Sequence, residues 1–363
     1  MSILIVVPDD RLGGAEQFLK MLATYYLEKN EIVYVFFLKK SSENGWGDLF
    51  QFENLKLQYG VTNYDLFGFL GLFYHLIRLN KIKFQFVFTS HTYITGIIGA
   101  MIKVKLIKKS YFVGRESTAI FNRFSGVKLL ILKILYKIGF FNLDLLICQT
   151  EEMKRQLVNG MPSLKIKIKI KVIENPIDLN RIKLFEKENI NTNIYGNYII
   201  GAGRLIYLKG FDLLIKSIRK LQDQSINLIL LGEGEEKGKL VTLINNLNLN
   251  TKVHLLGKVD NVYPYFKNAK ACVVSSRIEG FPNVLLQMMS QSNSVVSTTC
   301  AGGIKDIPGL FTCNVDCVNE LSKTIDYALS DPNIGNRIVF NDYLKSRTIS
   351  NFVIKMERYL NNC

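Results

Sequence analysis

Short apolar runs alternate with longer segments of helical period along the whole chain. Runs of four to eight apolar residues separated by amphipathic helices are typical of parallel sheets covered by helices. The pattern therefore predicts an α/β fold with two doubly wound parallel sheets, one in each half of the chain. The expected strands are residues 3–7, 32–38, 84–89, 111–114 and 145–149 in the first half, and 198–203, 226–232, 252–257, 271–275 and 294–298 in the second.

The segment between the two halves has its own pattern. Residues 164–182, LKIKIKIKVIENPIDLNRI, begin with alternating Lys and Ile, which predicts a strand with one apolar and one basic face. Lysines on such a strand could also protect a sheet edge from pairing with another chain. Asn175-Pro176 is a turn signal, and a chain of 363 residues is expected to form more than one domain. We therefore expect a first domain over 1–175 and a second over 176–345.

Composition limits the class of protein. The chain is 48% hydrophobic and 21% charged, which is ordinary for a folded enzyme. Its six cysteines are scattered without a Cys-x-x-Cys pair, so neither a metal site nor a disulfide framework is expected, and a reducing compartment is favoured. The opening SILIVVP suits a buried strand better than a signal peptide, and no apolar segment reaches membrane-spanning length. We expect a cytoplasmic protein, either free or peripheral on the inner face of a membrane.

The net charge of +15 is concentrated in part of the first half. Residues 101–140 hold nine basic residues and one acid, Glu116. The segment lacks interleaved base-stacking aromatics or a reading module, so nucleic acid is not an expected partner. The same segment can form a basic amphipathic helix, in which Arg123, Lys133 and Lys137 lie near one another on the helical wheel. Contact with an anionic membrane and a core helix with a solvated stripe are equally compatible with this pattern.

The stretch SSRIEGFPNVLLQMMS, residues 275–290, has the features of a ligand-binding helix start. Pro282 suits the first turn of a helix, which is therefore expected to begin near Phe281. The free N–H groups of a helix start attract phosphate. Glu279 has the wrong sign to bind phosphate, but it could bind a neutral hydroxylated group next to it, such as a sugar.

Two further motifs follow expected strands. In DDRLGGAE, residues 9–16, Gly13 and Gly14 allow a ligand to approach the backbone, although a tight turn that caps a helix is the commoner explanation. In GAGRLIYLKG, Arg204 lies at a strand end and Lys209 five residues later. Two such cations could neutralise a diphosphate.

The motifs GGAE, GAGRLIYLKG, LLGEGEEK (230–237), LGKVDNV (256–262) and EGFPNVLLQMM together resemble the group 1 family of retaining nucleotide-sugar glycosyltransferases. The resemblance covers nearly the whole chain. It implies the GT-B architecture, in which an N-terminal acceptor-binding and a C-terminal nucleotide-sugar-binding Rossmann-like domain face a central cleft. It also implies a C-terminal helix, residues 346–363, that returns to the first domain.

The resemblance assigns roles to individual residues. Arg204 and Lys209 match the diphosphate clamp, and Glu279 matches the acid that binds donor-sugar hydroxyls. Gly14 matches a first-domain loop near the reaction centre. His91 resembles a histidine near the transferred sugar, although a lone His after a strand is often structural. The loop that meets the sugar and diphosphate is matched by Gly280, Phe281, Pro282 and Asn283.

One position departs from the family pattern. Where the family usually has a second acid that accepts hydrogen bonds from the ribose, this chain has Gln287. An amide keeps an acceptor oxygen but loses the charge. We therefore expect weaker nucleotide binding with activity retained.

The resemblance implies an enzyme that uses no cofactor and no metal, and the chain has no Asp-x-Asp triplet. It would transfer a hexose or N-acetylhexosamine from a nucleoside diphosphate, expected to be UDP, with retention of configuration. The acceptor would be a glycan or a lipid-diphosphate-linked glycan of a surface polysaccharide such as lipopolysaccharide or capsule. The alternatives are a sugar-nucleotide epimerase of the same fold and a non-catalytic nucleotide-binding partner.

Overall fold

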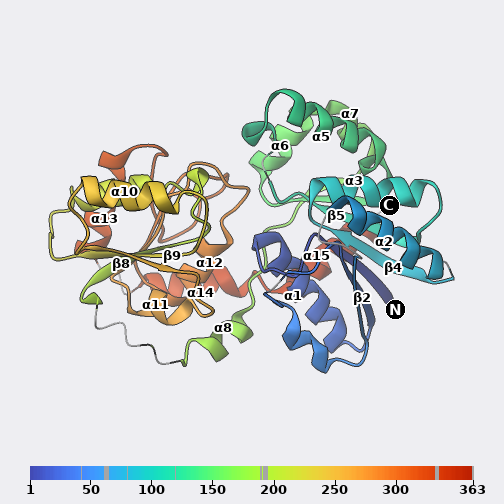
Figure 1. Ribbon diagram of the computed structural model, residues 1–363, viewed down its shortest axis with the longest axis horizontal. Helices are drawn as coiled ribbons and strands as arrows, with labels where there is room; N and C mark the ends of the chain where they lie inside the picture. The colour runs from blue at the N-terminus through green and yellow to red at the C-terminus, as the bar shows by residue number, and fades with distance from the viewer. Residues whose placement is uncertain are drawn as a thin grey trace. The chain divides into compact units, whose positions relative to one another are not determined.

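The computed structural model describes residues 1–41, 43–60, 65–79, 81–118, 120–188, 190, 195–331 and 335–361. The chain divides into two compact units (Figure 1). The first comprises Met1–Pro176 with Ile349–Cys363, and the second comprises Ile177–Thr348. Within the described residues, no helix combines the length and the apolar character needed to cross a bilayer.

The first unit is built on a seven-stranded parallel sheet in the order β3-β2-β1-β4-β5-β6-β7. Helices cover both faces, because one core cluster joins α1 and α15 to the sheet and a second joins α2, α3, α5, α6 and α7 to the other face. Its strands are β1 (Ser2–Val7), β2 (Ile32–Phe37), β3 (Leu55–Tyr59), β4 (Lys83–Thr89), β5 (Lys108–Arg115), β6 (Leu145–Cys148) and β7 (Ile170–Val172). Its helices are α1 (Gly14–Glu28), α2 (Asp65–Arg78), α3 (Thr92–Lys103), α4 (Ile120–Arg123), α5 (Gly126–Ile138), α6 (Glu151–Gly160), α7 (Pro162–Lys167) and α15 (Ile349–Asn361), with 3-10 turns η1 (Gly47–Gln51) and η2 (Phe140–Asn142).

The last helix, α15, belongs to the first unit although the second unit precedes it in the chain. It packs on α1, where the rings of Phe18 and Phe352 meet edge to face with centroids 5.0 Å apart. Val353 and Met356 on the same face of α15 are fully buried. The C-terminal residues therefore complete the hydrophobic core of the N-terminal sheet.

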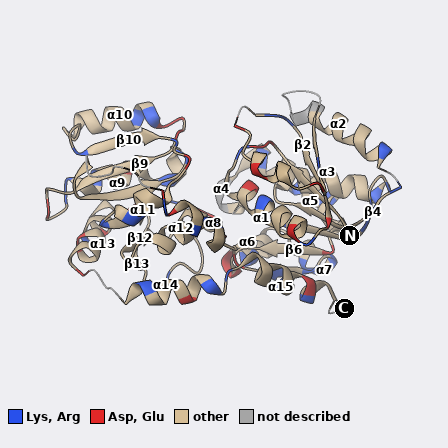
Figure 2. Ribbon diagram, turned by 90° about the horizontal axis from the view of Figure 1, so that it is seen from below, with Lys and Arg blue, Asp and Glu red and all other residues tan. Residues whose placement is uncertain are grey.

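The second unit has a six-stranded parallel sheet in the order β10-β9-β8-β11-β12-β13. Its strands carry almost no charge, and Lys, Arg, Asp and Glu lie mainly on helices and loops (Figure 2). The strands are β8 (Tyr198–Ala202), β9 (Asn227–Leu231), β10 (Val253–Gly257), β11 (Ala271–Val274), β12 (Val295–Thr298) and β13 (Phe311–Cys313). The helices are α8 (Leu179–Phe185), α9 (Phe211–Ile218), α10 (Lys237–Asn246), α11 (Tyr263–Asn268), α12 (Asn283–Gln291), α13 (Val318–Ser330) and α14 (Asn336–Lys345), with a 3-10 turn η4 (Tyr207–Lys209).

All ten predicted strands overlap observed strands, but the strand predicted from residue 164 is wrong at its start. Residues Pro162–Lys167 form helix α7, and the strand covers only Ile170–Val172. Leu164 and Ile168, four residues apart, are buried, whereas Ile166 between them is 86% exposed. The burial thus has a helical period, which the alternation of Lys and Ile in the sequence does not predict. The strand that does form, β7, lies at the edge of the sheet.

The basic helix is also shorter than predicted. Its start at Gly126 leaves Arg123 on the separate helix α4, so Arg123 does not share a helix face with Lys133 and Lys137. Gly126 has φ +58, a left-handed conformation that glycine adopts without strain. The chain therefore turns between the two helices.

Candidate functional site

The predicted donor-site residues lie where the strand order of the second sheet reverses. From β8 the chain proceeds through β9 and β10 toward one edge, and then through β11, β12 and β13 toward the other. Strands β8 and β11 are neighbours, so the loops that leave their carboxyl ends lie side by side. In open parallel sheets ligands bind at this switch point. Arg204 and Lys209 lie on the loop after β8, and Glu279 to Pro282 lie on the loop after β11, with Asn283 as the first residue of α12.

Lys209 and Glu279 come from these two loops and form an ion pair. The Lys209 Nζ lies 2.5 Å from Glu279 Oε1, and each side chain is less than one-fifth exposed. The same carboxylate oxygen accepts a hydrogen bond of 2.8 Å from Ser276 Oγ. The backbone N–H of Glu279 donates to the Cys300 carbonyl at 2.9 Å, which ties this loop to the end of β12. The two groups predicted to bind diphosphate and sugar therefore neutralise each other in this structure.

Arg204 is placed differently from Lys209. Its backbone is fixed, because Leu205 donates to the Glu233 carbonyl and the Leu205 carbonyl accepts from Glu236, both at 2.9 Å. Gly234 lies so close to this strip that a Cβ there would be 2.3 Å from the Leu205 oxygen. The Arg204 side chain is exposed, and no described residue forms an ion pair with it. The segment 230–237 thus holds the backbone next to Arg204 in place, while the Arg204 guanidinium is exposed to solvent.

Helix α12 begins two residues later than predicted. Pro282 is its N-cap with φ −76 and ψ 104, and Asn283 is its first residue. Phe281 is 9% exposed and belongs to the hydrophobic core, which requires the chain to stay extended before it turns into the helix. Gly280 precedes it and is partly exposed. The loop that resembles the sugar and diphosphate loop is therefore anchored by a buried aromatic ring.

Gln287 lies one turn into α12 and is partly exposed. Its Nε2 is 3.5 Å from the hydroxyl of Tyr263, the first residue of α11. Burial raises the pKa of Tyr263 to about 12, so this hydroxyl stays protonated at neutral pH. The amide therefore has a neutral neighbour that can both donate and accept a hydrogen bond.

In the first unit the switch point lies between β1 and β4, and it holds the other two predicted residues. Gly13 is the N-cap of α1 and Gly14 its first residue, while His91 is the N-cap of α3. The His91 Nε2 lies 2.9 Å from Glu16 Oε1, and no described residue bonds its buried Nδ1. Burial acts to raise the pKa of Glu16, but the hydrogen bond and charge of His91 outweigh it and the net pKa is lowered. A Cβ at Gly13 would lie 2.5 Å from Glu16 Oε2.

A buried acid, Glu116, follows β5 in the same unit. Its carboxylate accepts hydrogen bonds from the Tyr136 hydroxyl and, at 3.3 Å, from Thr92 Oγ1. Burial raises the pKa of Glu116 to about 7. This acid belongs to the interior of the unit, since it is 3% exposed.

Sequence reasoning missed three residues that these contacts involve. Glu16 stands in the quoted GGAE motif but was given no role, and its contact with His91 joins residues 75 positions apart. Ser276 and Arg277 stand in the SSRIEG segment, where Arg277 is 8% exposed and binds two carboxylates. The available signal was a polar run, SSR, directly after a buried strand.

The architecture defines a class of protein. Over its whole length the chain is similar to the crystal structure of Anabaena HepE in complex with UDP-glucose, with a TM-score of 0.80, 18% identity and 100% of both chains covered. It is also similar to sucrose-phosphate synthase from Thermosynechococcus elongatus, with a TM-score of 0.76, 14% identity, and 98% and 97% of the two chains covered. The fold is GT-B, with two parallel-sheet α/β units.

The second unit identifies the family. The family model described as glycosyl transferases group 1 matches residues 180–344. An uncharacterized glycosyltransferase of Methanocaldococcus jannaschii is 35% identical over 184 residues, 49% of this chain and 45% of the relative. The Campylobacter jejuni enzyme N-acetylgalactosamine-N,N'-diacetylbacillosaminyl-diphospho-undecaprenol 4-alpha-N-acetylgalactosaminyltransferase is 31% identical over 194 residues, 52% of each chain. Residues 180–344 of the second unit therefore carry a glycosyl transferases group 1 domain. The matched stretches span about half the length of these relatives.

Proposed function

We propose that the protein is a retaining glycosyltransferase that moves a sugar from a nucleoside diphosphate, UDP, to a glycan or lipid-linked acceptor. The observation that carries this proposal is the Lys209–Glu279 pair at the β8/β11 switch point. A cation and a carboxylate held side by side suit a ligand that presents a phosphate next to hydroxyl groups, as a sugar nucleotide does. The roles of the individual residues form part of the same proposal.

In this proposal Lys209 and the exposed Arg204 bind the diphosphate, and Glu279 accepts hydrogen bonds from the sugar. The bond between the anomeric carbon and the diphosphate oxygen breaks, and the acceptor oxygen bonds to the same face of that carbon. The acceptor proton passes to the departing phosphate, and the two cations stabilise the charge that develops there. The step needs no metal. Roles for Gly14 and His91 of the first unit form part of the same proposal and rest on the family resemblance.

The choice of UDP and of a lipid-linked acceptor rests on relatives. HepE is solved with UDP-glucose, and the Campylobacter enzyme is named for a diphospho-undecaprenol substrate. A hexose or an N-acetylhexosamine is compatible with both. An epimerase of the same fold is disfavoured because the group 1 family model matches most of the second unit.

The test is calorimetric titration of UDP, GDP and ADP into the wild type and into Arg204→Ala, with a chelator present. We expect UDP to bind the wild type and to bind the variant about tenfold or more weakly, because a charged hydrogen bond contributes roughly 1.5–3 kcal/mol. A screen of UDP-sugars for transfer to undecaprenyl-diphosphate glycans follows. Failure of every nucleotide to bind would remove the donor-site assignment, and binding without transfer would favour a non-catalytic nucleotide-binding protein.

We further propose that helix α5 contacts an anionic membrane. Its outward face carries Val127, Leu130, Ile131, Ile134 and Ile138, which are 47% to 73% exposed. These residues fall within about 100° on the helical wheel, with Lys133 and Lys137 along one border and Lys128 along the other. An apolar stripe bordered by lysines matches a surface of anionic lipid headgroups over acyl chains.

The opposite face of α5 is committed to the first unit. A Cβ on Gly99 of α3 would lie 2.1 Å from the Gly139 carbonyl oxygen, and a Cβ on Gly139 would lie 1.9 Å from that of Gly96. Tyr136 on this side is fully buried. The backbones of α3 and of the α5 C-terminus are therefore in direct contact, and the helix cannot turn its apolar face inward.

Vesicle sedimentation tests this surface. We expect the protein to bind phosphatidylglycerol vesicles at low salt, and Leu130→Ser with Ile134→Ser to abolish binding, because each aliphatic side chain contributes up to roughly 1.5–3 kcal/mol when buried. Lys133→Gln with Lys137→Gln should weaken it by about 1 kcal/mol per charge. Val241→Ser on α10 is the control for loss of an exposed apolar residue. Vesicle binding that is unchanged in all these variants would contradict a lipid-binding role. A protein dimer that dissociates in the Leu130→Ser, Ile134→Ser variant would contradict it as well.

A further inference from the structure

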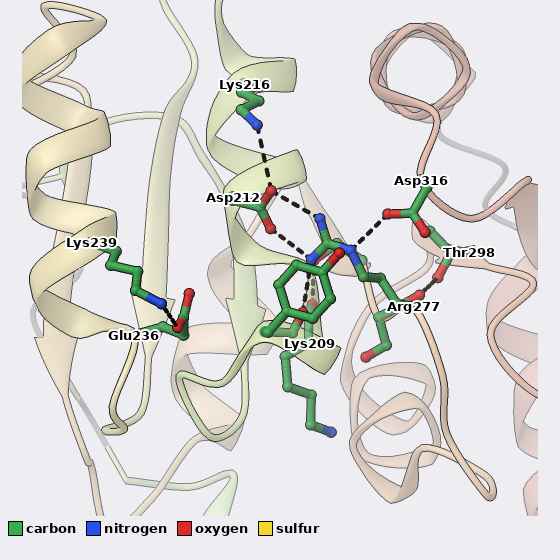
Figure 3. A network of polar contacts seen from close by, with 11 residues as sticks. Lys209, Asp212, Lys216, Glu236, Lys239, Arg277, Thr298 and Asp316 are labelled. Carbon is green, nitrogen blue, oxygen red and sulfur yellow. Dashed lines mark hydrogen bonds and ion pairs between the residues drawn. The ribbon is translucent and has the colours of Figure 1, made fainter. Parts of the chain in front are cut away.

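Arg277 joins three segments of the second unit (Figure 3). Its guanidinium donates from Nη1 and Nη2 to the two carboxylate oxygens of Asp212, at 2.8 and 2.9 Å, and from Nε to Asp316 at 2.6 Å. The Tyr207 ring lies beneath it, 4.0 Å from the guanidinium carbon. Asp212 is in the first turn of α9 and Asp316 lies between β13 and α13, so one side chain links the loop after β11 to the start of α9 and to the loop after β13.

Arg277 and Ser275 also hold the turn that carries Lys209. Three successive carbonyls, those of residues 207–209, accept hydrogen bonds from the β11 loop. The first accepts from Arg277 Nη1 at 2.7 Å, the second from the Arg277 backbone N–H at 2.8 Å, and the third from Ser275 Oγ at 3.0 Å. The β11 loop therefore fixes η4 along its whole length.

The contact between the two loops leaves no room for adjustment. Gly210, which follows Lys209, has φ +63, and a Cβ there would lie 2.1 Å from the Ser275 carbonyl oxygen. The next carbonyl, that of Ser276, accepts from Thr298 Oγ1 at 2.5 Å. After Arg277, the Glu279 N–H donates to the Cys300 carbonyl, so the backbone is held on both sides of Arg277.

The electrostatics of Arg277 differ from those of a surface ion pair. The Arg277 side chain is 8% exposed, whereas Asp212 is 28% and Asp316 56% exposed, so the contact with Asp212 is the better shielded from water. Burial acts to lower its pKa, but the hydrogen bonds and charges of Asp212 and Asp316 outweigh it and raise the pKa. A buried cation with two such partners holds one geometry, because leaving any of them unpaired is costly.

We propose that Arg277 is a positioning residue, which sets the distance between Lys209 and Glu279 by fixing turn 207–209 against the β11 loop. Arg277 itself binds no substrate in this scheme. The inference rests on the proposed function, since Lys209 must bind the diphosphate for its position to affect nucleotide binding. Its distinctive consequence is that the effect of Arg277 on nucleotide binding passes through Lys209.

A double-mutant cycle tests this consequence. UDP affinity is measured by calorimetry for the wild type, Arg277→Met, Lys209→Ala and the double variant, well below each melting temperature. We expect Arg277→Met to weaken UDP binding on the order of tenfold, a typical coupling between neighbouring residues, and to have almost no effect when Lys209 is already Ala. Arg277→Lys, which keeps the charge without the two-nitrogen fork, should restore only part of the affinity.

Matched variants separate positioning from general destabilisation. Arg337→Met removes a partly exposed arginine of the second unit, one that binds the Met289 carbonyl, and should lower the melting temperature without changing UDP affinity. If Arg277→Met does not fold, Asp212→Asn and Asp316→Asn take its place, and Asp212→Asn should have the larger effect because it accepts two hydrogen bonds.

The possible outcomes have different meanings. A folded Arg277→Met variant with wild-type UDP affinity would overturn the positioning role while the proposed function stands. Equal losses in the wild-type and Lys209→Ala backgrounds would also overturn it, because the effect would then not pass through Lys209. Absence of UDP binding to the wild type would remove the proposed function and this inference together.

Discussion

Replacing Glu279 with Gln should strengthen the binding of UDP, although Glu279 is the acid predicted to bind the donor sugar. In the structure the Lys209 ammonium already has an anionic partner in Glu279, at 2.5 Å. A nucleotide that binds Lys209 through its diphosphate must displace this carboxylate. UDP without a sugar offers the displaced carboxylate no new hydrogen-bond donor. Glu279 would keep only Ser276, which already donates to it.

The size of the effect follows from the two kinds of hydrogen bond. A bond between charged groups contributes roughly 1.5–3 kcal/mol and a neutral one about 1 kcal/mol. Both side chains are less than one-fifth exposed, so solvent screens the pair only in part. Breaking the contact between Lys209 and residue 279 should therefore cost about 1 kcal/mol less in Glu279→Gln than in the wild type. This difference corresponds to a roughly fivefold lower Kd for UDP. For UDP-sugar the gain is offset, because the sugar hydroxyls lose a charged acceptor.

The assay is calorimetric titration of UDP and of the UDP-sugar that the screen identifies, into the wild type, Glu279→Gln and Asp342→Asn. The last variant removes an equal charge from an exposed pair on α14 and controls for net charge. We expect UDP affinity to rise only in Glu279→Gln, and the preference for UDP-sugar over UDP to fall. A UDP affinity that falls in Glu279→Gln, as it should in Lys209→Ala, would refute the competition between carboxylate and diphosphate.

Three further changes give measurable outcomes. Gln287→Glu should tighten UDP binding about fivefold in the same titration, because a charged acceptor replaces a neutral one for the ribose, and an unchanged Kd would contradict this placement. Gly210→Ala should destabilise the protein by about 1–3 kcal/mol or more and weaken UDP binding, because Gly210 has φ +63 and a Cβ there would clash with the Ser275 carbonyl. A variant that unfolds at the wild-type temperature would show that the two loops can move apart at this contact. Because burial raises the pKa of Glu116 from 4.5 to about 7, its ionisation destabilises the fold as pH rises through this window and has no effect below it. Glu116→Gln should therefore raise the melting temperature more at pH 8 than at pH 5, by the equivalent of about 3 kcal/mol, and equal shifts at both pH values would argue against a raised pKa.

The positions of the strands could be predicted from sequence because both faces of a parallel sheet are buried. Runs such as ILIVV and INLILLG are then continuously apolar and stand out from the amphipathic helices. Strand β3, LKLQY, and the three-residue β13 lack this signal and were missed. Residues 164–169 were assigned to a strand because alternating Lys and Ile have period two. The signals for the helix were Pro162 at its start and the four-residue spacing of the buried Leu164 and Ile168.

The candidate site was predictable only where its chemistry lies in short motifs. Arg204, Lys209 and Glu279 each follow a strand and carry a charge, so their place at one edge of a sheet could be inferred from the parallel topology. The contacts between these residues could not be predicted, because neither motif contains information on the strand order that makes β8 and β11 neighbours. The same holds for Arg277 and for the contact of His91 with Glu16, both of which join loops far apart in the chain.

The Lys209–Glu279 pair also indicates how the proposed site could distinguish donor from product. An intact UDP-sugar offers an anion to Lys209 and hydroxyls to Glu279, so both members of the pair exchange one partner for another. UDP alone satisfies only Lys209 and leaves Glu279 with Ser276. After transfer, the carboxylate would again compete for the lysine and favour release of UDP. Arg277 matters to this exchange because the competition requires the two loops to stay at hydrogen-bonding distance, and a looser contact would weaken donor binding and product release together.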